Sequence, residues 1–203
     1  MRRLSVFAGG FSLEAAEAVG VAGEGGTAEV LSLLSSLVDK SLAQVDDQAD
    51  RYRLLETIRA YAAEGLAASG EEAAIRDRHL AFYLDLAERA GRVIWGSSGP
   101  SWLAVLSTEL DNLRAAMDWA MASGQADAGT RLVCAIGQFL YLGCHITEGR
   151  SRCEELLAHD TSPAQRVGLY RWAAYFASWS DPAATPTARP WSTSAGSWET
   201  TRP

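Results

Sequence analysis

The fold is decided by the stretch "TAEVLSLLSSLVDKSLAQVDDQADRYRLLETIRAYAAEGL", residues 27–66. Its first part predicts a helix, because apolar residues recur on one helical face: Val30, Leu31, Leu34, Leu37 and Val38. The segments "LAQV" (42–45) and "RYRLL" (51–55) follow, and the polar "DDQAD" between them predicts a β-hairpin. From Glu56 the helical spacing returns, with a stripe of Ile58, Tyr61, Ala62 and Leu66. The stretch is therefore predicted to form a helix, a hairpin and a second helix.

Toward the N-terminus, residues 2–20, "RRLSVFAGGFSLEAAEAVG", predict two shorter helices. In the second of them Ser12 is placed to cap the N-terminus, Glu14 lies in the first turn and Gly20 ends the helix. Three helices, a two-stranded wing and a further helix follow the element order of a winged helix-turn-helix. We therefore predict a winged-helix domain over residues 1–70.

The double glycine Gly9-Gly10 between those two helices raises the question of a phosphate-binding loop. Such a loop needs backbone N–H groups around the phosphates and a lysine that reaches them, in the pattern GxxxxGK[ST]. No lysine lies within reach of Gly9-Gly10, and no strand leads into a GxGxxG pattern. Gly25-Gly26 carries no phosphate-binding pattern either. We interpret Gly9-Gly10 as a tight turn between helices that needs positive φ.

Residues 71–180 predict an array of amphipathic helices, roughly at 71–93, 101–122, 126–143, 147–158 and 164–179. Helices of this length joined by short loops are typical of antiparallel pairs of the tetratricopeptide (TPR) type, although no clean repeat of about 34 residues aligns. The fold class is therefore predicted as mainly all-α. It combines a winged helix-turn-helix that has one small β-hairpin with a TPR-like antiparallel helical array.

The last stretch, "DPAATPTARPWSTSAGSWETTRP" (181–203), holds four of the six prolines and has no helical period. Its composition predicts a disordered tail. With G/C-rich codons, one shifted reading frame of this stretch can spell "GGDADGAALVDECRELGDDAA", which is amphipathic. A frameshift is therefore a hypothesis, and the nucleotide sequence of the gene decides it.

The scatter of reactive side chains argues against an enzyme. His79, His145 and His159 lie far apart in the sequence, and His79 is expected to pack at a helix surface. No triad spacing occurs. Neighbouring carboxylates such as Glu71 and Glu72 point in different directions on a helix and do not converge on a substrate. We predict no catalytic residue.

The cysteines and the apolar runs exclude further classes of protein. Cys134, Cys144 and Cys153 are sparse and form no CxxC pair, which indicates neither a disulfide framework nor a metal site. No apolar run approaches the roughly 18 residues that span a bilayer, and the N-terminal apolar stretch is too short for a signal peptide. We expect a cytoplasmic protein with no membrane contact.

DNA is a natural partner of a winged helix, because its third helix enters the major groove. Here that helix carries only Glu29 and Asp39, with Lys40 after them, and the whole chain has a net charge of −7. The arginines of the wing and the helix after it are candidates for contact with DNA, for contact with another protein domain or for pairing within the chain: Arg51, Arg53 and Arg59. The charges favour another protein domain over DNA as the partner of this wing.

Four phrases in this order carry a family resemblance: "RRLSVFAGGFSLEAAEAV", "LLSSLVDKSL", "RYRLLETIRAYAAEGL" and "WLAVLSTELDNLRAAMDWAM". Together they resemble the bacterial signal-transduction ATPases of the STAND class, and more specifically the large predicted-ATPase and LuxR-type transcriptional regulators of actinobacteria. The resemblance covers about residues 2–180. In that family a P-loop nucleotide-binding domain of NB-ARC type precedes a winged helix and TPR-like repeats.

The resemblance implies that the winged helix packs on the ATPase domain and helps to hold the ADP-bound, inactive state. In the family a Met-His-Asp motif at the end of the wing reaches the nucleotide. The matching residues here are Leu54, Leu55 and Glu56, so the acid is kept and a leucine replaces the histidine. Glu56 is thus the candidate for nucleotide contact, and capping of the following helix is its favoured role.

The P-loop, the acidic Walker B strand and a DNA-binding effector domain of the family have no counterpart in this sequence. We therefore expect a non-catalytic fragment of such a regulator, with a protein or the missing NB-ARC-type domain as partner. ATP or ADP is implied only for the missing domain, and no cofactor is expected on this chain. The alternative is a stand-alone winged-helix DNA-binding transcriptional regulator with a helical sensor domain.

Overall fold

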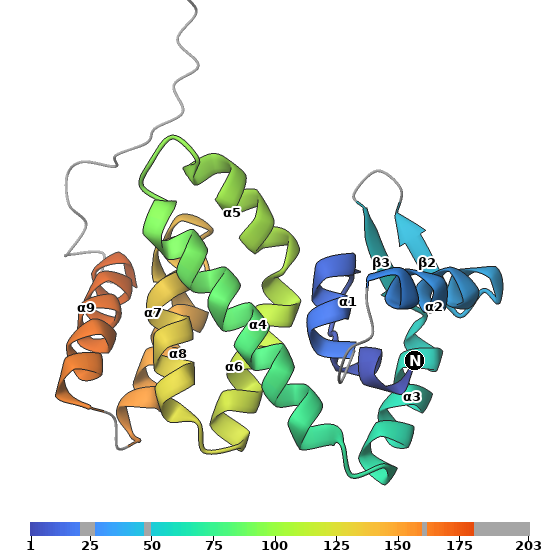
Figure 1. The fold of residues 1–203 in the computed structure, drawn as a ribbon. Helices are drawn as coiled ribbons and strands as arrows, with labels where there is room; N and C mark the ends of the chain where they lie inside the picture. The colour runs from blue at the N-terminus through green and yellow to red at the C-terminus, as the bar shows by residue number, and fades with distance from the viewer. Residues whose placement is uncertain (21–26, 47–49, 160–161, 181–203) are drawn as a thin grey trace, which may run out of the picture.

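The computed structural model describes residues 1–20, 27–46, 50–159 and 162–180. Over these ranges the chain is mainly helical, with a winged helix-turn-helix that has a small three-stranded sheet, followed by an array of six helices (Figure 1). This confirms the predicted fold class. The predictions for the tail 181–203, its shifted reading frame and Gly25-Gly26 concern residues outside the described ranges. The division of the chain at residue 70 stays a prediction.

The winged helix-turn-helix has its elements in this order: η1 Arg2–Val6, β1 Phe11–Ser12, α1 Leu13–Gly20, α2 Thr27–Asp39, β2 Ala43–Asp46, β3 Arg51–Leu54 and α3 Glu56–Ala68. Strands β2 and β3 form the predicted hairpin, with Val45 opposite Tyr52. Strand β1 pairs with the other edge of β3, so the antiparallel sheet has the order β1-β3-β2. The sequence predicted only the hairpin, because two residues are too short for β1 to show alternation.

The N-terminus of α1 is capped as the sequence predicts, because the backbone N–H of Ala15 donates to Ser12 Oγ at 3.2 Å. The prediction of positive φ at Gly9-Gly10 is wrong. Among the described glycines, positive φ occurs at Gly70 and Gly124. At Gly10 the constraint is space, since a Cβ there would lie 3.3 Å from the carbonyl oxygen of Tyr52. Gly10 therefore lets the chain enter β1 close against the neighbouring strand.

The helical array consists of α4 Glu72–Val93, α5 Gly99–Thr108, α6 Leu110–Ala122, α7 Ala126–Leu142, α8 Ile146–Leu157 and α9 Pro163–Ser180. The single helix predicted at 101–122 is wrong, because α5 ends and α6 begins on either side of Glu109. The backbone there has φ −93° and ψ 5°, outside the helical region. No glycine or proline marks this break, and Glu109, the residue at the break, makes the side-chain contacts described below.

The long helix α4 joins the two parts of the molecule. In Figure 1 it crosses the middle of the view, between the winged helix in blue and the later helices in yellow and orange. It packs against η1 and α1 of the winged helix and against α6 and α7 of the array. The array continues through α7, α8 and α9, which pack against one another. The winged helix is therefore fixed directly on the array.

An aromatic cluster carries the core across this junction. Phe7 stacks on Phe11 with ring centroids 4.5 Å apart, and it meets Tyr83 of α4 edge-on at 6.4 Å. The ring centroid of His79, also on α4, lies 5.4 Å from that of Phe7 and 4.6 Å from that of Tyr83. The expectation that His79 packs at a helix surface is wrong, because η1 covers this face of α4 and leaves His79 only 3% exposed.

Candidate functional site in the winged helix

Helix α2 has the position of the third helix of a winged helix-turn-helix, the one that enters the major groove in DNA-binding members. Its exposed residues include two leucines, Leu31 at 42% and Leu33 at 57% exposure. The charged residues of the helix, Glu29 and Asp39, are exposed and acidic, and Lys40 follows its end. Because binding to DNA depends on cations that neutralise phosphates, this face is better suited to an apolar surface than to DNA.

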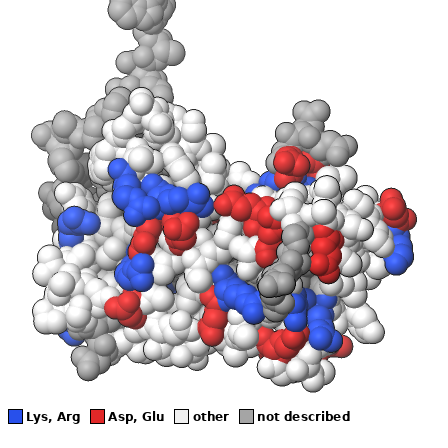
Figure 2. Space-filling model, in the orientation of Figure 1, with Lys and Arg blue, Asp and Glu red and all other residues white. Residues whose placement is uncertain are grey.

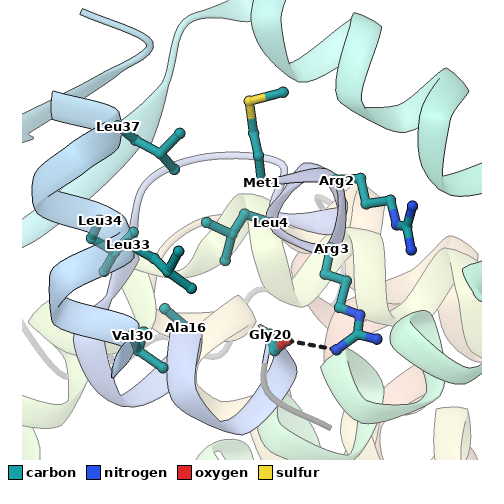
Figure 3. Close-up of a pocket in the computed structure, with 10 residues that line it drawn as sticks. All are labelled: Met1, Arg2, Arg3, Leu4, Ala16, Gly20, Val30, Leu33, Leu34 and Leu37. Carbon is teal, nitrogen blue, oxygen red and sulfur yellow. Dashed lines mark hydrogen bonds between the residues drawn. The ribbon is translucent and has the colours of Figure 1, made fainter. Parts of the chain in front are cut away.

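An apolar pocket opens beside the same helix, between α2, α1 and η1 (Figure 3). It has a volume of about 250 Å³, and it is lined by Met1, Arg2, Arg3, Leu4, Ala16, Gly20, Val30, Leu33, Leu34 and Leu37. Figure 3 shows the aliphatic side chains of α2 facing Leu4 across the pocket, with the two arginines at its rim. The pocket and the exposed leucines make one apolar surface, which we call the α2 surface.

The two arginines at the rim are held by contacts within the chain. Arg3 donates to Glu71 at 2.7 Å and to the carbonyl oxygen of Gly20 at 3.2 Å, and Arg2 donates to Glu71 at 3.3 Å. The hydrogen bond from Arg3 lowers the pKa of the Glu71 carboxyl below its ordinary value. The contacts tie η1 to the residue that precedes α4. They leave the α2 surface with an apolar floor and a polar edge.

Arg51, one of the three predicted contact residues, points into the junction with the helical array. Its guanidinium pairs with Glu109, between α5 and α6, and donates to the carbonyl oxygen of Gly10 at 2.6 Å. The side chains of Arg51 and Glu109 are 16% and 7% exposed. A phosphate could reach Arg51 only if this pair separated, which makes Arg51 a contact between the wing and the array.

Glu109 also accepts hydrogen bonds from α4 and α6. The hydroxyl of Tyr83 donates to Glu109 Oε2 at 3.0 Å, and Asn112 Nδ2 donates to the same oxygen at 2.9 Å. Burial raises the pKa of the Tyr83 hydroxyl above its ordinary value, and the nearby Glu109 carboxylate raises it further. One carboxylate thus binds three side chains from three elements.

The loop that contains Gly9-Gly10 is fixed by the same cluster. Asn112 Oδ1 accepts from the backbone N–H of Ala8 at 3.0 Å, and Asn112 Nδ2 donates to the carbonyl oxygen of Gly10 at 2.9 Å. Both hydrogen bonds join the winged helix to α6. Arg51, Tyr83, Glu109 and Asn112, with the loop they hold, are called the junction cluster below.

Glu56 and Arg59 form a local pair at the exposed start of α3. Arg59 donates to Glu56 through Nε at 3.0 Å and through a terminal nitrogen at 2.5 Å. This hydrogen bonding is the main cause that lowers the pKa of the Glu56 carboxyl. The predicted capping role of Glu56 is wrong. Leu55 has the cap position, and Glu56 lies inside the first turn, where its carboxylate reaches Arg59.

The three predicted arginines therefore do not form one cluster. Arg51 is buried in the junction and Arg59 is paired with Glu56, whereas Arg53 is exposed on β3, opposite Gln44. Leu55, where the family resemblance has a histidine, is 36% exposed and offers no hydrogen bond from its side chain. Whether any of these residues contacts DNA or another domain stays a prediction.

Tyr83, Glu109 and Asn112 were missed from the sequence. A signal for Glu109 was present, because it lies on the apolar stripe formed by Leu106, Leu110 and Leu113. A carboxylate on such a stripe indicates a buried partner. Nothing in the sequence indicated that this partner would be Arg51.

Within the described ranges, His, Cys, Asp and Glu nowhere gather in a group of three that could hold a metal ion. No helix among them combines the length and the apolar character that crossing a membrane requires.

Residues 1–67 match the family model described as "Winged helix-turn-helix domain". The N-terminal part of the chain is a winged helix-turn-helix domain. The chain is also similar to "Putative HTH-type transcriptional regulator Rv0890c" of Mycobacterium tuberculosis (strain ATCC 25618 / H37Rv), with 38% identity over 158 residues. The match to "Putative HTH-type transcriptional regulator Mb0914c" of Mycobacterium bovis (strain ATCC BAA-935 / AF2122/97) has the same identity and length.

These matches cover 77% of this chain and 18% of each relative. A further protein of Mycobacterium tuberculosis, "Uncharacterized protein Rv0894", is 39% identical over 102 residues, which cover 49% of this chain and 25% of that protein. No solved structure matches the chain significantly. More than three quarters of the chain is thus homologous to one region of large proteins named as putative HTH-type transcriptional regulators.

Proposed function

We propose that the chain is a non-catalytic regulatory part of a STAND-type signal-transduction ATPase and transcriptional regulator, in which the winged helix acts by contact with another protein domain. The observation that carries this proposal is the α2 surface. The helix that would enter a DNA groove exposes Leu31 and Leu33 beside an apolar pocket, and its own charges are acidic. Apolar surface of this kind is suited to a protein partner.

The partner of the α2 surface, in this proposal, is the nucleotide-binding domain of NB-ARC type that the family resemblance implies. The named relatives are much longer than the region they share with this chain, which is consistent with further domains in them. Nucleotide binding and ATP hydrolysis would belong to such a domain. The junction cluster supports a mechanical role for the winged helix, because a domain docked on α2 would act on the array through Arg51 and Glu109.

The experiment that tests this proposal supplies a nucleotide-binding domain of NB-ARC type, taken from a STAND-class regulator, as a separate protein and measures its affinity for this chain by calorimetry. We expect binding that weakens at least about tenfold in Leu33→Glu, because a charge would enter an apolar interface. Val167→Glu is the matched control, since Val167 is an aliphatic residue of α9 that is 69% exposed. Equal affinities of the two variants, or no binding by the unaltered chain, would contradict the proposal.

A second candidate function is DNA binding by the winged helix-turn-helix domain. The fold itself and the printed names of the relatives favour it. Arg53 and Lys40, both exposed, would be its phosphate contacts. A true DNA binder loses affinity steeply as salt rises, and this behaviour separates the two functions.

A further inference from the structure

A second hollow lies on the helical array, far along the chain from the α2 surface. It has a volume of about 530 Å³ and is lined by the end of α4 and the residues after it, by α7 and by α9. Figure 2 shows a group of Lys and Arg side chains on the left half of the view, with Asp and Glu side chains directly below it.

The floor of the hollow is rigid. Trp172 of α9 is 8% exposed, and its Nε1 donates to the carbonyl oxygen of Cys134 on α7 at 3.1 Å. Its indole lies directly on Gly137, where a Cβ would come within 2.2 Å of the ring. Only glycine allows this approach, so α7 and α9 hold the indole in one place. A fixed aromatic floor of this kind lowers the entropy lost on binding.

The cations around the floor outnumber the anions. Arg92, Arg131 and Arg171 line the hollow together with one carboxylate, Glu88, which pairs with Arg131 at 2.7 Å. Within the described part of the chain, Arg92 and Arg171 have no carboxylate partner, and the Arg171 guanidinium lies 5.6 Å from the ring centroid of Trp172. A local excess of positive charge in a chain of net charge −7 indicates an anionic ligand.

The hollow continues along α9 as an open groove. A second hollow of about 220 Å³ shares Trp95, Gln138, Arg171 and Trp172 with the first and adds Tyr141 and Tyr175. A third is lined by Arg171, Ala174, Tyr175 and Ser178. Exposed rings border this groove, with Trp95 at 79% and Tyr175 at 52% exposure. From Arg171 to Ser178 the helix axis covers roughly 10 Å, the length of about three extended residues.

The shape of the groove favours a peptide over a small molecule. Small-molecule sites bury most of the ligand surface in a cavity, whereas this groove is open along its length and bordered by exposed aromatic rings. A peptide, in contrast, can bind with only one of its faces in contact with the protein. Aromatic residues and arginines are also the residue types that carry most of the binding energy at protein interfaces.

We propose that the groove between α4, α7 and α9 binds an acidic segment of a protein partner. Carboxylates of that segment pair with Arg92 and Arg171, and an aromatic or aliphatic side chain packs between Trp95 and Trp172. The side-chain amide of Gln138, which is 7% exposed in the floor, is available to the peptide backbone. The proposal deepens the proposed function, on which it rests for the regulatory meaning of the binding, by giving the chemistry of the array's partner.

The test uses the full chain and a set of synthetic peptides of about 12 residues, rich in Asp and Glu, each with one central Phe, Leu or Trp. Fluorescence anisotropy of labelled peptides measures the affinity. Matched peptides carry Asn and Gln in place of the acids. We expect an acidic peptide to bind at least about tenfold more tightly than its neutral match, and this preference to shrink as salt rises.

Variants locate the binding. Arg92→Glu with Arg171→Glu should weaken the acidic peptide at least about tenfold, and Trp95→Ala should weaken acidic and neutral peptides to a similar degree. Arg150→Glu is the control, because Arg150 is a half-exposed arginine of α8 that pairs with Glu154. Should the double variant fail to fold, Arg92→Gln at its exposed position replaces it.

Three results would overturn the proposal: equal binding of acidic and neutral peptides, binding that the arginine variants leave unchanged, or no binding by any peptide of the set. Inorganic phosphate and free glutamate serve as further competitors. If either displaces the peptide at a concentration near the peptide's own Kd, the groove is a site for small anions and not for a peptide. None of these results changes the affinity of the α2 surface for its partner, so the two proposals fail separately.

Discussion

Two arginine–glutamate pairs near strand β3 differ in what they connect and in how much water surrounds them. Arg51 and Glu109 join the wing to the helical array across the sequence, with side chains 16% and 7% exposed. Arg59 and Glu56 are three positions apart on α3, and the Glu56 side chain is 73% exposed. The residue types are the same, but only the first pair is positioned to hold two parts of the molecule together. The comparison teaches that the burial of an arginine–glutamate pair decides its structural role. The presence of an arginine on or near the wing does not.

The largest effect is expected from Glu109→Ala. The change leaves the Tyr83 hydroxyl without its acceptor and removes the carboxylate partner of Arg51 and Asn112, which keep only the carbonyl oxygen of Gly10 as acceptor. Breaking such a largely buried pair costs about 3–5 kcal/mol of the free energy of unfolding. Urea unfolding followed by circular dichroism measures the loss. Glu56→Ala is the control and should leave the unfolding midpoint unchanged. Equal midpoints for the two variants would remove the difference between the pairs.

The next largest effect is a pH dependence of the free energy of unfolding, which His79 causes. Burial lowers the pKa of His79 to about 4 from its ordinary value of 6.5, so the folded imidazole stays neutral where the unfolded one binds a proton. The free energy of unfolding should therefore fall as the pH drops from about 6.5 to about 4, by up to about 3 kcal/mol from this group.

His79→Phe should remove that part of the pH dependence, because a phenyl ring can pack against Phe7 and Tyr83 without titrating. His159→Gln, at an exposed position, should keep it. Unfolding in urea at a series of pH values gives the three curves. A curve for His79→Phe that runs parallel to that of the unaltered chain would show that His79 does not titrate differently on folding.

A smaller effect tests the close approach at the double glycine. Gly10→Ala brings a Cβ to 3.3 Å from the carbonyl oxygen of Tyr52 and should cost about 1–2 kcal/mol of stability. Gly65→Ala on α3 has open space around the new Cβ and should stabilise the helix by about 0.5–1 kcal/mol. Thermal unfolding compares the two variants. If both substitutions shifted the melting temperature in the same direction, Gly10 would not be constrained by space.

The smallest effect is expected from Arg59→Met, which removes the exposed pair with Glu56. Surface pairs of this kind contribute little, so the free energy of unfolding should change by less than about 0.5 kcal/mol. Urea unfolding in low and high salt measures it. A loss comparable to that of Glu109→Ala would place a structural contact on the outer side of α3.

The sequence predicted those features of the fold that depend on neighbouring residues. The stripe of Val30 and Leu34, the hairpin and the cap at Ser12 each follow from a local pattern, and each is present. The ion pair of Glu109 and the burial of His79 were not predicted, because both depend on groups far away in the sequence, Arg51 in one case and Phe7 in the other.

The candidate site was predicted in its residue types and not in its arrangement. The sequence drew attention to Arg51, Arg53 and Arg59 as one group, but their directions follow from the strand pleat and from what lies beside each residue. Arg51 finds a carboxylate that the break between α5 and α6 presents, and no local pattern indicated it. The pocket beside α2 likewise depends on how η1 packs against α1 and α2.

The most direct test of the central claim, that this winged helix acts on protein and not on DNA, is a titration of labelled duplex DNA with the intact chain. Fluorescence anisotropy at about 20 mM and about 200 mM salt gives the affinity and its salt dependence. We predict no binding at low salt, and no difference between the unaltered chain and Arg53→Ala. Tight binding that falls by orders of magnitude at the higher salt, and that Arg53→Ala weakens, would contradict the account.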